Sequence, residues 1–465
     1  MPMMLGRRTV LRGFAGVGLG TAALATGAVG IAAAIGAARP ELPDLPELPL
    51  DRSLPGIARG TLTAAPVAGG PAANQLGYAG TYPGPLIRLR EGERLELDYR
   101  NRTELTTNLH FHGLFVEPGG SGDNPWITVE PGESFRYGLN VGPGNAGLHW
   151  YHPHVHGRSG SSALAQMRGL VGPILVEHPG KDRLPAADDR ILVLHDIAIE
   201  DGSVARGQLN DWAVGREGDL LLVNGVRYPK VSAQHAWLRL RLVNASNARY
   251  WHLSASDDGL LLQVAQDGTL LARPREIRDF LMPPGSRAEL MVPLSGRAPF
   301  DLVNRPYSRV GSVYSGETPV LHIRPDRSFD EQRRLPDRLA DWPEFDVSQV
   351  ARRREIPIAL LTICGRYFDS QRVDFPVQAG SCEVWTLRNV DLMDHPIHLH
   401  TWRFEPLRLN GTAMPYRARL DTFNLRPGDT LDIGISFERY TGNSLFHCHI
   451  VEHADKGMMA IVNVS

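Results

Sequence analysis

A short strand unit occurs three times along the chain, about 140 residues apart, and this repeat restricts the folds that the sequence can adopt. The copies span residues 79–101, 223–244 and 363–389, and each ends at an asparagine. Each contains a turn and then a segment in which apolar and polar residues alternate. This alternation predicts short strands with one buried face, and no long helical pattern competes with it. The repeat therefore predicts an all-β chain of three Greek-key β-sandwich domains, with one short helix expected near 161–167 and another after His449.

Histidines gather in four short clusters, and their spacing predicts metal ligands. The clusters hold two, two, three and three of the 17 histidines: His110 and His112; His152 and His154; His395, His398 and His400; His447, His449 and His453. On a strand, side chains two residues apart share a face, so a His-X-His pair can offer two imidazoles to one site. A single pair is more often an accident of a polar strand face. Four clusters together are typical of transition-metal binding.

Cys448 indicates which metal the clusters bind. It stands between His447 and His449 and has the opposite parity, so it faces another site across the same strand. One thiolate, two imidazoles and a weak axial methionine form a blue-copper electron-transfer centre. The residues that supply this set are Cys448, His395, His453 and Met458. Electrons can then pass from copper at Cys448 to a second centre that includes His447 and His449, an arrangement that zinc would leave unexplained.

The four motifs resemble the copper motifs of the three-domain bacterial multicopper oxidases, the laccase-like family related to copper-efflux oxidases and spore-coat laccases. The motifs are His-Phe-His-Gly from His110, His-Pro-His from His152, His-Pro-Ile-His-Leu-His from His395 and His-Cys-His-Ile-Val-Glu-His from His447. The resemblance spans residues 60–465, although the middle of the chain matches only in its strand pattern. It implies three consecutive cupredoxin-like domains and four copper ions.

The resemblance also implies a role for each ligand. Cys448, His395, His453 and the axial Met458 would bind the type 1 copper. The type 2 copper would be bound by His110 and His398, one type 3 copper by His112, His152 and His449, and the other by His154, His400 and His447. The type 2 and type 3 coppers would form the trinuclear site that reduces O₂.

The expected domain boundaries follow from the repeat and the motifs. We expect a signal segment at 1–38, a Pro-rich linker at 39–58 and a first domain with trinuclear ligands at 59–182. A copper-free spacer domain is expected at 183–328, and a third domain with the type 1 copper and the other trinuclear ligands at 345–465. Arg7 and Arg8 precede an apolar Gly/Ala-rich run, which resembles a twin-arginine export signal. A membrane anchor is the alternative. We expect a periplasmic, cell-envelope or extracellular protein that is not stably inserted in a membrane after signal removal.

Carboxylates near the motifs are candidates for proton supply, because reduction of O₂ to water consumes protons. Asp123 resembles the family's acidic residue beside the type 2 copper, and we predict catalytic roles for Asp123 and Cys448; a plain turn residue is the alternative for Asp123. Many bacterial members carry a carboxylate directly after the last type 1 histidine, where this chain has Ala454. Asp455 and Glu452 are the possible substitutes.

Cys364 and Cys382 are the other two of three cysteines. We expect them on strands that could be neighbours, so either a disulfide, which export would permit, or two buried free thiols is consistent with the sequence.

The leading functional hypothesis is a laccase-like oxidase that takes single electrons from a phenolic or aromatic donor and passes four of them to O₂. The alternative is a cuprous oxidase for copper tolerance. Asp391 and Met393 resemble positions that touch Cu(I) in copper-efflux members, although a turn acid and a core methionine are the favoured explanation; the chain has only 10 methionines and no Met-rich insert. A copper-free cell-envelope scaffold would require lost ligands, and none is missing. Nitrite reductase has no use for a trinuclear site. The net charge of −2 does not favour nucleic acid, and a monomer is the simpler expectation.

Overall fold

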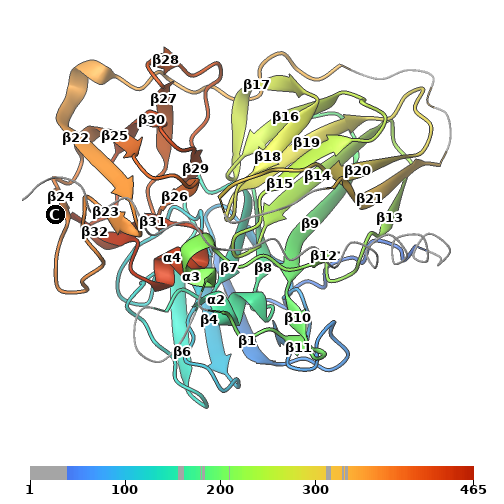
Figure 1. Ribbon diagram of the computed structural model, residues 1–465, viewed down its shortest axis with the longest axis horizontal. Coiled ribbons are helices and arrows are strands. Elements are labelled where there is room, and N and C mark those ends of the chain that lie inside the picture. Colours follow the sequence, from blue (N-terminus) through green and yellow to red (C-terminus); the bar gives the residue numbers. More distant parts are fainter. Residues whose placement is uncertain are drawn as a thin grey trace, which may run out of the picture. The chain divides into compact units, whose positions relative to one another are not determined.

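The three repeat strands occupy equivalent places in three pairs of sheets. They are β4 (Arg94–Asn101), β14 (Trp237–Asn244) and β25 (Cys382–Asn389), labelled in Figure 1. Each pairs in parallel with the first long strand of its domain and antiparallel with a later one. In β4 the alternate residues Leu95, Leu97 and Tyr99 are fully buried, as the pattern predicts.

The asparagine that ends each copy explains why the repeat is so regular. The side-chain amide of Asn101 donates to the carbonyls of Leu105 and Val129. Asn244 and Asn389 make the same two kinds of bond, one to a carbonyl five or four residues ahead, respectively, and one to a carbonyl from a distant segment. Each Oδ1 also accepts from the backbone N–H two residues ahead. The asparagine thus fixes the turn that follows the strand, which the first and third domains use to direct the chain towards a histidine cluster.

The structure is a computed structural model that describes residues 39–155, 162–178, 180, 184–208, 210–310, 316–326, 329 and 334–465. The expected signal segment 1–38 lies outside the described residues. Residues Pro40–Ser465 form one compact unit. Within the described part of the chain, no helix has the length and apolar character needed to cross a bilayer.

The first domain has two four-stranded sheets, in the orders β2-β1-β4-β6 and β3-β8-β7-β5, around a core that includes Leu97 and Phe111. Its other elements are β1 (Ile57–Pro66), β2 (Leu76–Tyr78), β3 (Ile87–Arg90), β5 (His110–His112), β6 (Ser134–Asn140), β7 (Gly147–His152), α2 (Ser162–Met167) and β8 (Gly172–Glu177).

The second domain has sheets in the orders β12-β9-β14-β19-β16-β17 and β13-β21-β20-β15-β18, with a small β10-β11 ribbon. Its other elements are β9 (Asp188–Ile197), β10 (Ile199–Glu200), β11 (Ser203–Val204), α3 (Asp211–Val214), β12 (Leu220–Val223), β13 (Lys230–Ala233), β15 (Trp251–Ala255), β16 (Leu261–Gln266), β17 (Thr269–Ile277), β18 (Asp279–Met282), β19 (Arg287–Pro293), β20 (Phe300–Asn304) and β21 (Thr318–Pro325).

The third domain has sheets in the orders β23-β22-β25-β30-β27-β28 and β24-β32-β31-β26-β29. Its other elements are the 3₁₀ helix η1 (Val347–Gln349), β22 (Val350–Ala359), β23 (Thr362–Ile363), β24 (Phe375–Val377), β26 (His395–Leu399), β27 (Phe404–Leu409), β28 (Thr412–Ala413), β29 (Thr422–Leu425), β30 (Thr430–Ser436), β31 (Gly442–Cys448), α4 (Val451–Asp455) and β32 (Met459–Val464). Helices α2 and α4 lie where the sequence predicts them.

Two features differ from the sequence analysis. The segment expected as a linker forms isolated β-bridges through Glu41 and Glu47, with Lys230 and Leu86, so it lies along the first two domains. Cys364 and Cys382 are both free, one exposed and the other half-buried. They cannot pair, because β22 lies between their strands and they sit near opposite ends of it. They are not two buried thiols either.

Candidate metal centre

Four strands carry six of the ten clustered histidines, and their pairing brings the clusters together two by two. In the first domain β5 and β7 are antiparallel, with His110 opposite His152. In the third domain β26 and β31 are antiparallel, with His398 opposite His447. Asn108 extends the first pair beyond the end of β7, because its side chain exchanges hydrogen bonds with both the N–H and the carbonyl of His154. Asn108 was not expected from the sequence.

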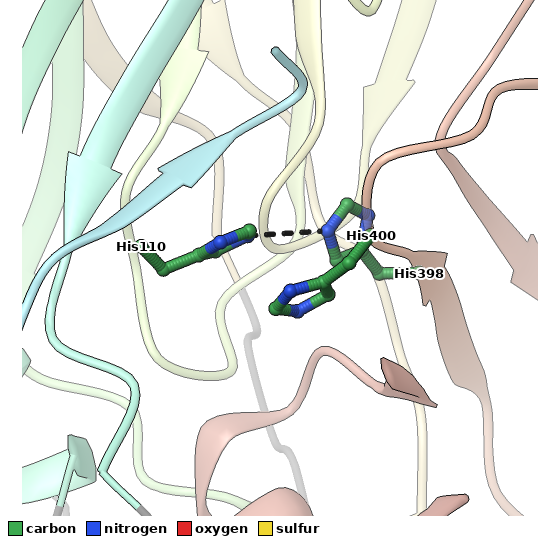
Figure 2. Close-up of side chains that lie close together, drawn as sticks. All are labelled: His110, His398 and His400. Carbon is green, nitrogen blue, oxygen red and sulfur yellow. Dashed lines mark hydrogen bonds between the residues drawn. The ribbon is translucent and has the colours of Figure 1, made fainter. Parts of the chain in front are cut away.

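Histidines from the first and third domains meet face to face. Nε2 of His110 lies 3.4 Å from Nε2 of His398, and Figure 2 shows these two rings with His400 beside them. Nε2 of His447 lies 3.1 Å from Nε2 of His154 and 2.9 Å from Nε2 of His400. Two groups of nitrogen atoms are close enough to share an ion: those of His110, His398 and His400, and those of His154, His400 and His447.

The remaining predicted set is more loosely arranged. The ring centroids of His112, His152 and His449 lie 4.9 to 5.9 Å apart. His112 also stacks on His398, with the centroids 3.8 Å apart. All eight of these histidines are buried. The structure therefore brings the eight residues predicted for the trinuclear site into one cluster between two domains.

Cys448 faces away from this cluster, towards a second group. Its Sγ lies 3.6 Å from Nδ1 of His395 and 3.6 Å from Nδ1 of His453. Met458 is fully buried, and its carbonyl accepts a hydrogen bond from the Cys448 N–H. Alternate residues at the end of β31 thus serve two separate centres, one with sulfur and one with nitrogen only.

These side chains fit resident metal ions. Nε2 of His112 and both ring nitrogens of His449 have no hydrogen-bond partner among the described residues. Burial, reinforced by neighbouring histidines, lowers the pKa of His112, His400 and His449 well below the ordinary value and that of His152 to about 3. The rings are therefore neutral and can offer lone pairs to a cation. Unpaired buried nitrogens are otherwise unfavourable.

The thiol of Cys448 leads to the same conclusion. Burial raises its pKa to about 12, so the thiol keeps its proton near neutral pH unless a cation replaces it. A copper ion held by this sulfur and two imidazoles supplies that cation.

Asp123 is buried against His110, one of the two predicted type 2 ligands. Its Oδ2 lies 2.9 Å from Nδ1 of His110, and its Oδ1 accepts a 2.8 Å hydrogen bond from the Phe111 N–H. Burial raises the pKa of Asp123 to about 7. The carboxylate can therefore orient the His110 ring and exchange a proton near neutral pH.

The two carboxylates flanking the last type 1 histidine have different surroundings. Asp455 lines a cavity of about 10 Å³, close to the volume one water needs, together with His154 and His447. Glu452 is buried instead against Asn247, whose amide donates to it at 2.9 Å, and burial raises the pKa of Glu452 to about 7. Ala454 also lines the small cavity.

The outer nitrogens of the two type 1 histidines have different partners. Nε2 of His453 donates to the carbonyl of Ala213 in α3, at 3.2 Å. Nε2 of His395 lies 3.1 Å from Oδ2 of Asp391. The hydrogen bond from His395 lowers the pKa of Asp391, although burial opposes this. Met393 is half-buried. Two routes of approach to the sulfur centre can therefore be distinguished, one over α3 and one over Asp391.

The middle domain, predicted as a spacer, also reaches the histidines. Gly285 packs against the ring of His449, and Arg287 approaches Nδ1 of His112 to 3.1 Å. Neither residue was expected from the sequence. The local pattern offers only an arginine at the start of a mainly apolar segment, after Pro283 and Pro284. Of the flanking histidines, His149 is buried with Nε2 against the Asn145 carbonyl, and His156 lies outside the described residues.

Comparison with known proteins gives a consistent result. Two models of the multicopper oxidase family match residues 61–181 and 340–465. The multicopper oxidase mco of Staphylococcus haemolyticus is 30% identical over 401 residues, which is 84% of each chain. The laccase of Bacillus subtilis is 25% identical over 84% of this chain and 90% of its own. The cell division protein FtsP of Shigella dysenteriae is 30% identical over 75% of both chains.

Solved structures agree over a similar length. A multicopper oxidase from Campylobacter jejuni, described as a metallo-oxidase, superposes with a TM-score of 0.82 at 27% identity, covering 92% of this chain and 96% of its own. A laccase-like oxidase from Ochrobactrum sp., described as active towards lignin model compounds, has a TM-score of 0.78 at 29% identity, covering 91% and 100%. The chain belongs to the multicopper oxidase family, a family of copper oxidoreductases that use O₂.

Proposed function

We propose that this protein is a laccase-like oxidase that removes single electrons from a phenolic or other aromatic donor and passes them to O₂. Four bound coppers would supply the redox chemistry, with donor oxidation at the Cys448 centre and four-electron reduction of O₂ to water at the trinuclear centre. The observation that carries the proposal is the parity at the end of β31. Cys448 is covalently joined to His447 and His449, so one strand end connects the two centres.

The chain's own residues have separate tasks in this proposal. His395, His453, Cys448 and Met458 hold the electron-accepting centre away from water, since all four are buried. Asp123 orients His110 through Nδ1 and holds a proton near the trinuclear histidines. Asp455 lines both the small cavity beside His154 and a larger pocket open to solvent. It therefore lies between solvent and the histidine cluster and can carry protons there, which the side chain of Ala454 cannot do.

The approach over α3 supports an organic donor. A pocket of about 990 Å³ is lined by Trp212 of α3 and by Lys456 beyond α4, and it has room for an aromatic molecule. Trp212 is 41% exposed and adjoins Ala213, whose carbonyl bonds the outer nitrogen of His453. A donor stacked on Trp212 would be linked to the type 1 ligand His453 through the backbone of Ala213 and one hydrogen bond. The activity described for the Ochrobactrum oxidase supports the same class of donor.

A cuprous oxidase is the second candidate, favoured by the Asp391 contact with His395. A carboxylate there offers oxygen to a metal ion next to a type 1 ligand. The metallo-oxidase description of the Campylobacter jejuni protein is consistent with this candidate. Oxygen uptake with a phenol and with Cu(I) should be measured for the unchanged protein and for Asp391→Asn. A phenolic oxidase keeps its rate with the phenol in Asp391→Asn. If the unchanged protein oxidises Cu(I) more efficiently than the phenol, and the variant loses this activity, the cuprous oxidase replaces the proposal.

Two measurements test the shared part of both candidates. Metal analysis should find four coppers per chain, and Cys448→Ser should lose the blue colour and donor oxidation while remaining folded. A protein that binds no copper would instead fit a scaffold role, as the FtsP relationship allows. Wild-type oxidase activity in Cys448→Ser would refute the electron path.

We also propose that the protein is exported through a twin-arginine-type signal and acts as a monomer. The motif at Arg7 and Arg8 supports export. Replacing both with lysine should retain the protein in the cytoplasm, as cell fractionation would show. Light scattering of the holoprotein tests the monomer.

A further inference from the structure

Arg287 is a fully buried arginine at the first position of β19, and its guanidinium contacts three domains. Towards the first domain, Nε donates to the Leu148 carbonyl at 3.4 Å, and Nη1 lies 3.1 Å from Nδ1 of His112. Within its own domain, Nη1 donates to the Gly285 carbonyl at 3.3 Å. Towards the third domain, it donates two hydrogen bonds to the carboxylate of Asp421, of 2.7 and 2.6 Å. Such fork-shaped pairing fixes both partners in orientation.

Asp421 in turn contacts a second predicted ligand, His398. Its backbone carbonyl lies 2.8 Å from Nδ1 of His398, and Thr422 Oγ1 lies 3.3 Å from the same nitrogen. Thr422 Oγ1 also donates to Asp421 Oδ1 at 2.9 Å. The orientation of His398 therefore depends on the segment that Arg287 holds.

Asp267 completes the network from the middle domain. Its Oδ1 accepts from the Arg287 backbone N–H at 3.0 Å, and its Oδ2 accepts from the N–H groups of Asp421 and Thr422 at 3.3 and 3.1 Å. Residue 113 must be a glycine, because a Cβ at this position would collide with the Arg287 guanidinium. Asp267, Arg287 and Asp421 are all buried, so no solvent could replace a lost partner.

We propose that Arg287, held by Asp267 and paired with Asp421, is a positioning residue. It fixes the orientation of His112 and His398 relative to one another across the interface between the first and third domains. The middle domain then acts as a template for the trinuclear site, although it supplies none of the predicted ligands. The inference rests on the proposed function, because it assumes that these histidines hold copper. Residues that orient metal ligands typically change metal affinity or activity about 10- to 100-fold when replaced.

The test uses full-length holoprotein with Arg287→Met and Arg287→Lys. Copper per chain, the blue absorption and the type 2 electron paramagnetic resonance signal are measured for each. We expect Arg287→Met to keep the blue centre and to bind the trinuclear coppers about 10- to 100-fold more weakly, with a changed type 2 signal. Lysine keeps the charge but cannot form the two-bond fork with Asp421. Arg287→Lys should therefore fold better and still show an altered type 2 signal.

The matched control is Arg239→Met. Arg239 is also buried, and it pairs with Glu289 on the same strand as Arg287, but it contacts none of the predicted ligands by a described hydrogen bond. This variant should lose stability and keep all copper signals. If Arg287→Met does not fold, Arg287→Lys decides. A wild-type type 2 signal and copper content in the folded Arg287 variants would overturn the positioning role alone, whereas absence of copper from the unchanged protein would overturn the proposed function.

Discussion

Gly285 offers a sharp test of how the middle domain meets the copper ligands. Its φ of +83° lies in the left-handed region, and a Cβ built there would lie 2.6 Å from Cδ2 and 2.7 Å from Nε2 of His449. Gly285→Ala should therefore incur two costs. The backbone conformation costs roughly 1–2 kcal/mol for a residue with a side chain, and overpacking costs about 1–3 kcal/mol. Together they predict a loss of about 2–5 kcal/mol in the free energy of unfolding.

Gly296→Ala is the matched control for this variant. Gly296 lies in the same domain with a similar φ of +71°, but no atom lies within 4 Å of its built Cβ. It should lose only the backbone part, roughly 1–2 kcal/mol. Urea unfolding of apoprotein gives both values, and their difference isolates the contact with His449. If the His449 ring moves instead, the stability difference shrinks and the type 3 copper absorption of the holoprotein weakens.

The outcome that would refute this reasoning is specific. Gly285→Ala would have to match Gly296→Ala in stability and also match the unchanged protein in type 3 absorption and oxygen uptake. The turn before β19 would then not pack against His449 as described.

Three further predictions concern charge, thiol exposure and proton supply. Burial opposes ionisation of Glu289, but Arg239 and Arg241 outweigh burial and hold the pKa of Glu289 below 4.5. The stabilisation from this carboxylate is therefore present above pH 4.5 and is lost as the pH falls through the lowered pKa. Glu289→Gln should flatten the acid limb of a curve of unfolding free energy against pH, and an unchanged limb would contradict the pairing. Cys364 is exposed, so a thiol reagent should modify it in the folded protein, and protection of every thiol would contradict the fold around it. Asp123→Asn should keep the blue colour and slow oxygen uptake about 10- to 100-fold; an undiminished rate would leave Asp123 as a turn residue.

Local pattern was sufficient to predict the fold class and the four histidine clusters, whereas the role of each ligand came from the family resemblance. Strand alternation and parity act over two or three residues, so the opposite directions of Cys448 and His447 follow from their order in the chain. The asparagines that end the repeats were visible, but their double hydrogen bonds were not, because each involves a carbonyl from a distant segment.

The parts that the sequence could not supply depend on the order of strands and the joining of domains. Cys364 and Cys382 seemed able to pair because nothing in the sequence places β22 between them. The role of Arg287 could not be inferred from the sequence, since its partners lie 175 and 134 residues away in other domains. Likewise, the contact of His453 with α3 joins residues 240 positions apart.

The meeting of His110 with His398 and of His154 with His447 joins positions 288 and 293 residues apart. Ions coordinated there would crosslink the two ends of the chain, and they bind only where the first and third domains have already docked. By mass action, the copper supply then sets the stability of the protein, since a ligand at 100 times its Kd raises the free energy of unfolding by about 2.7 kcal/mol. Copper-starved molecules should consequently open at this joint first and be cleaved there by proteases, whereas replete molecules unfold as a single unit.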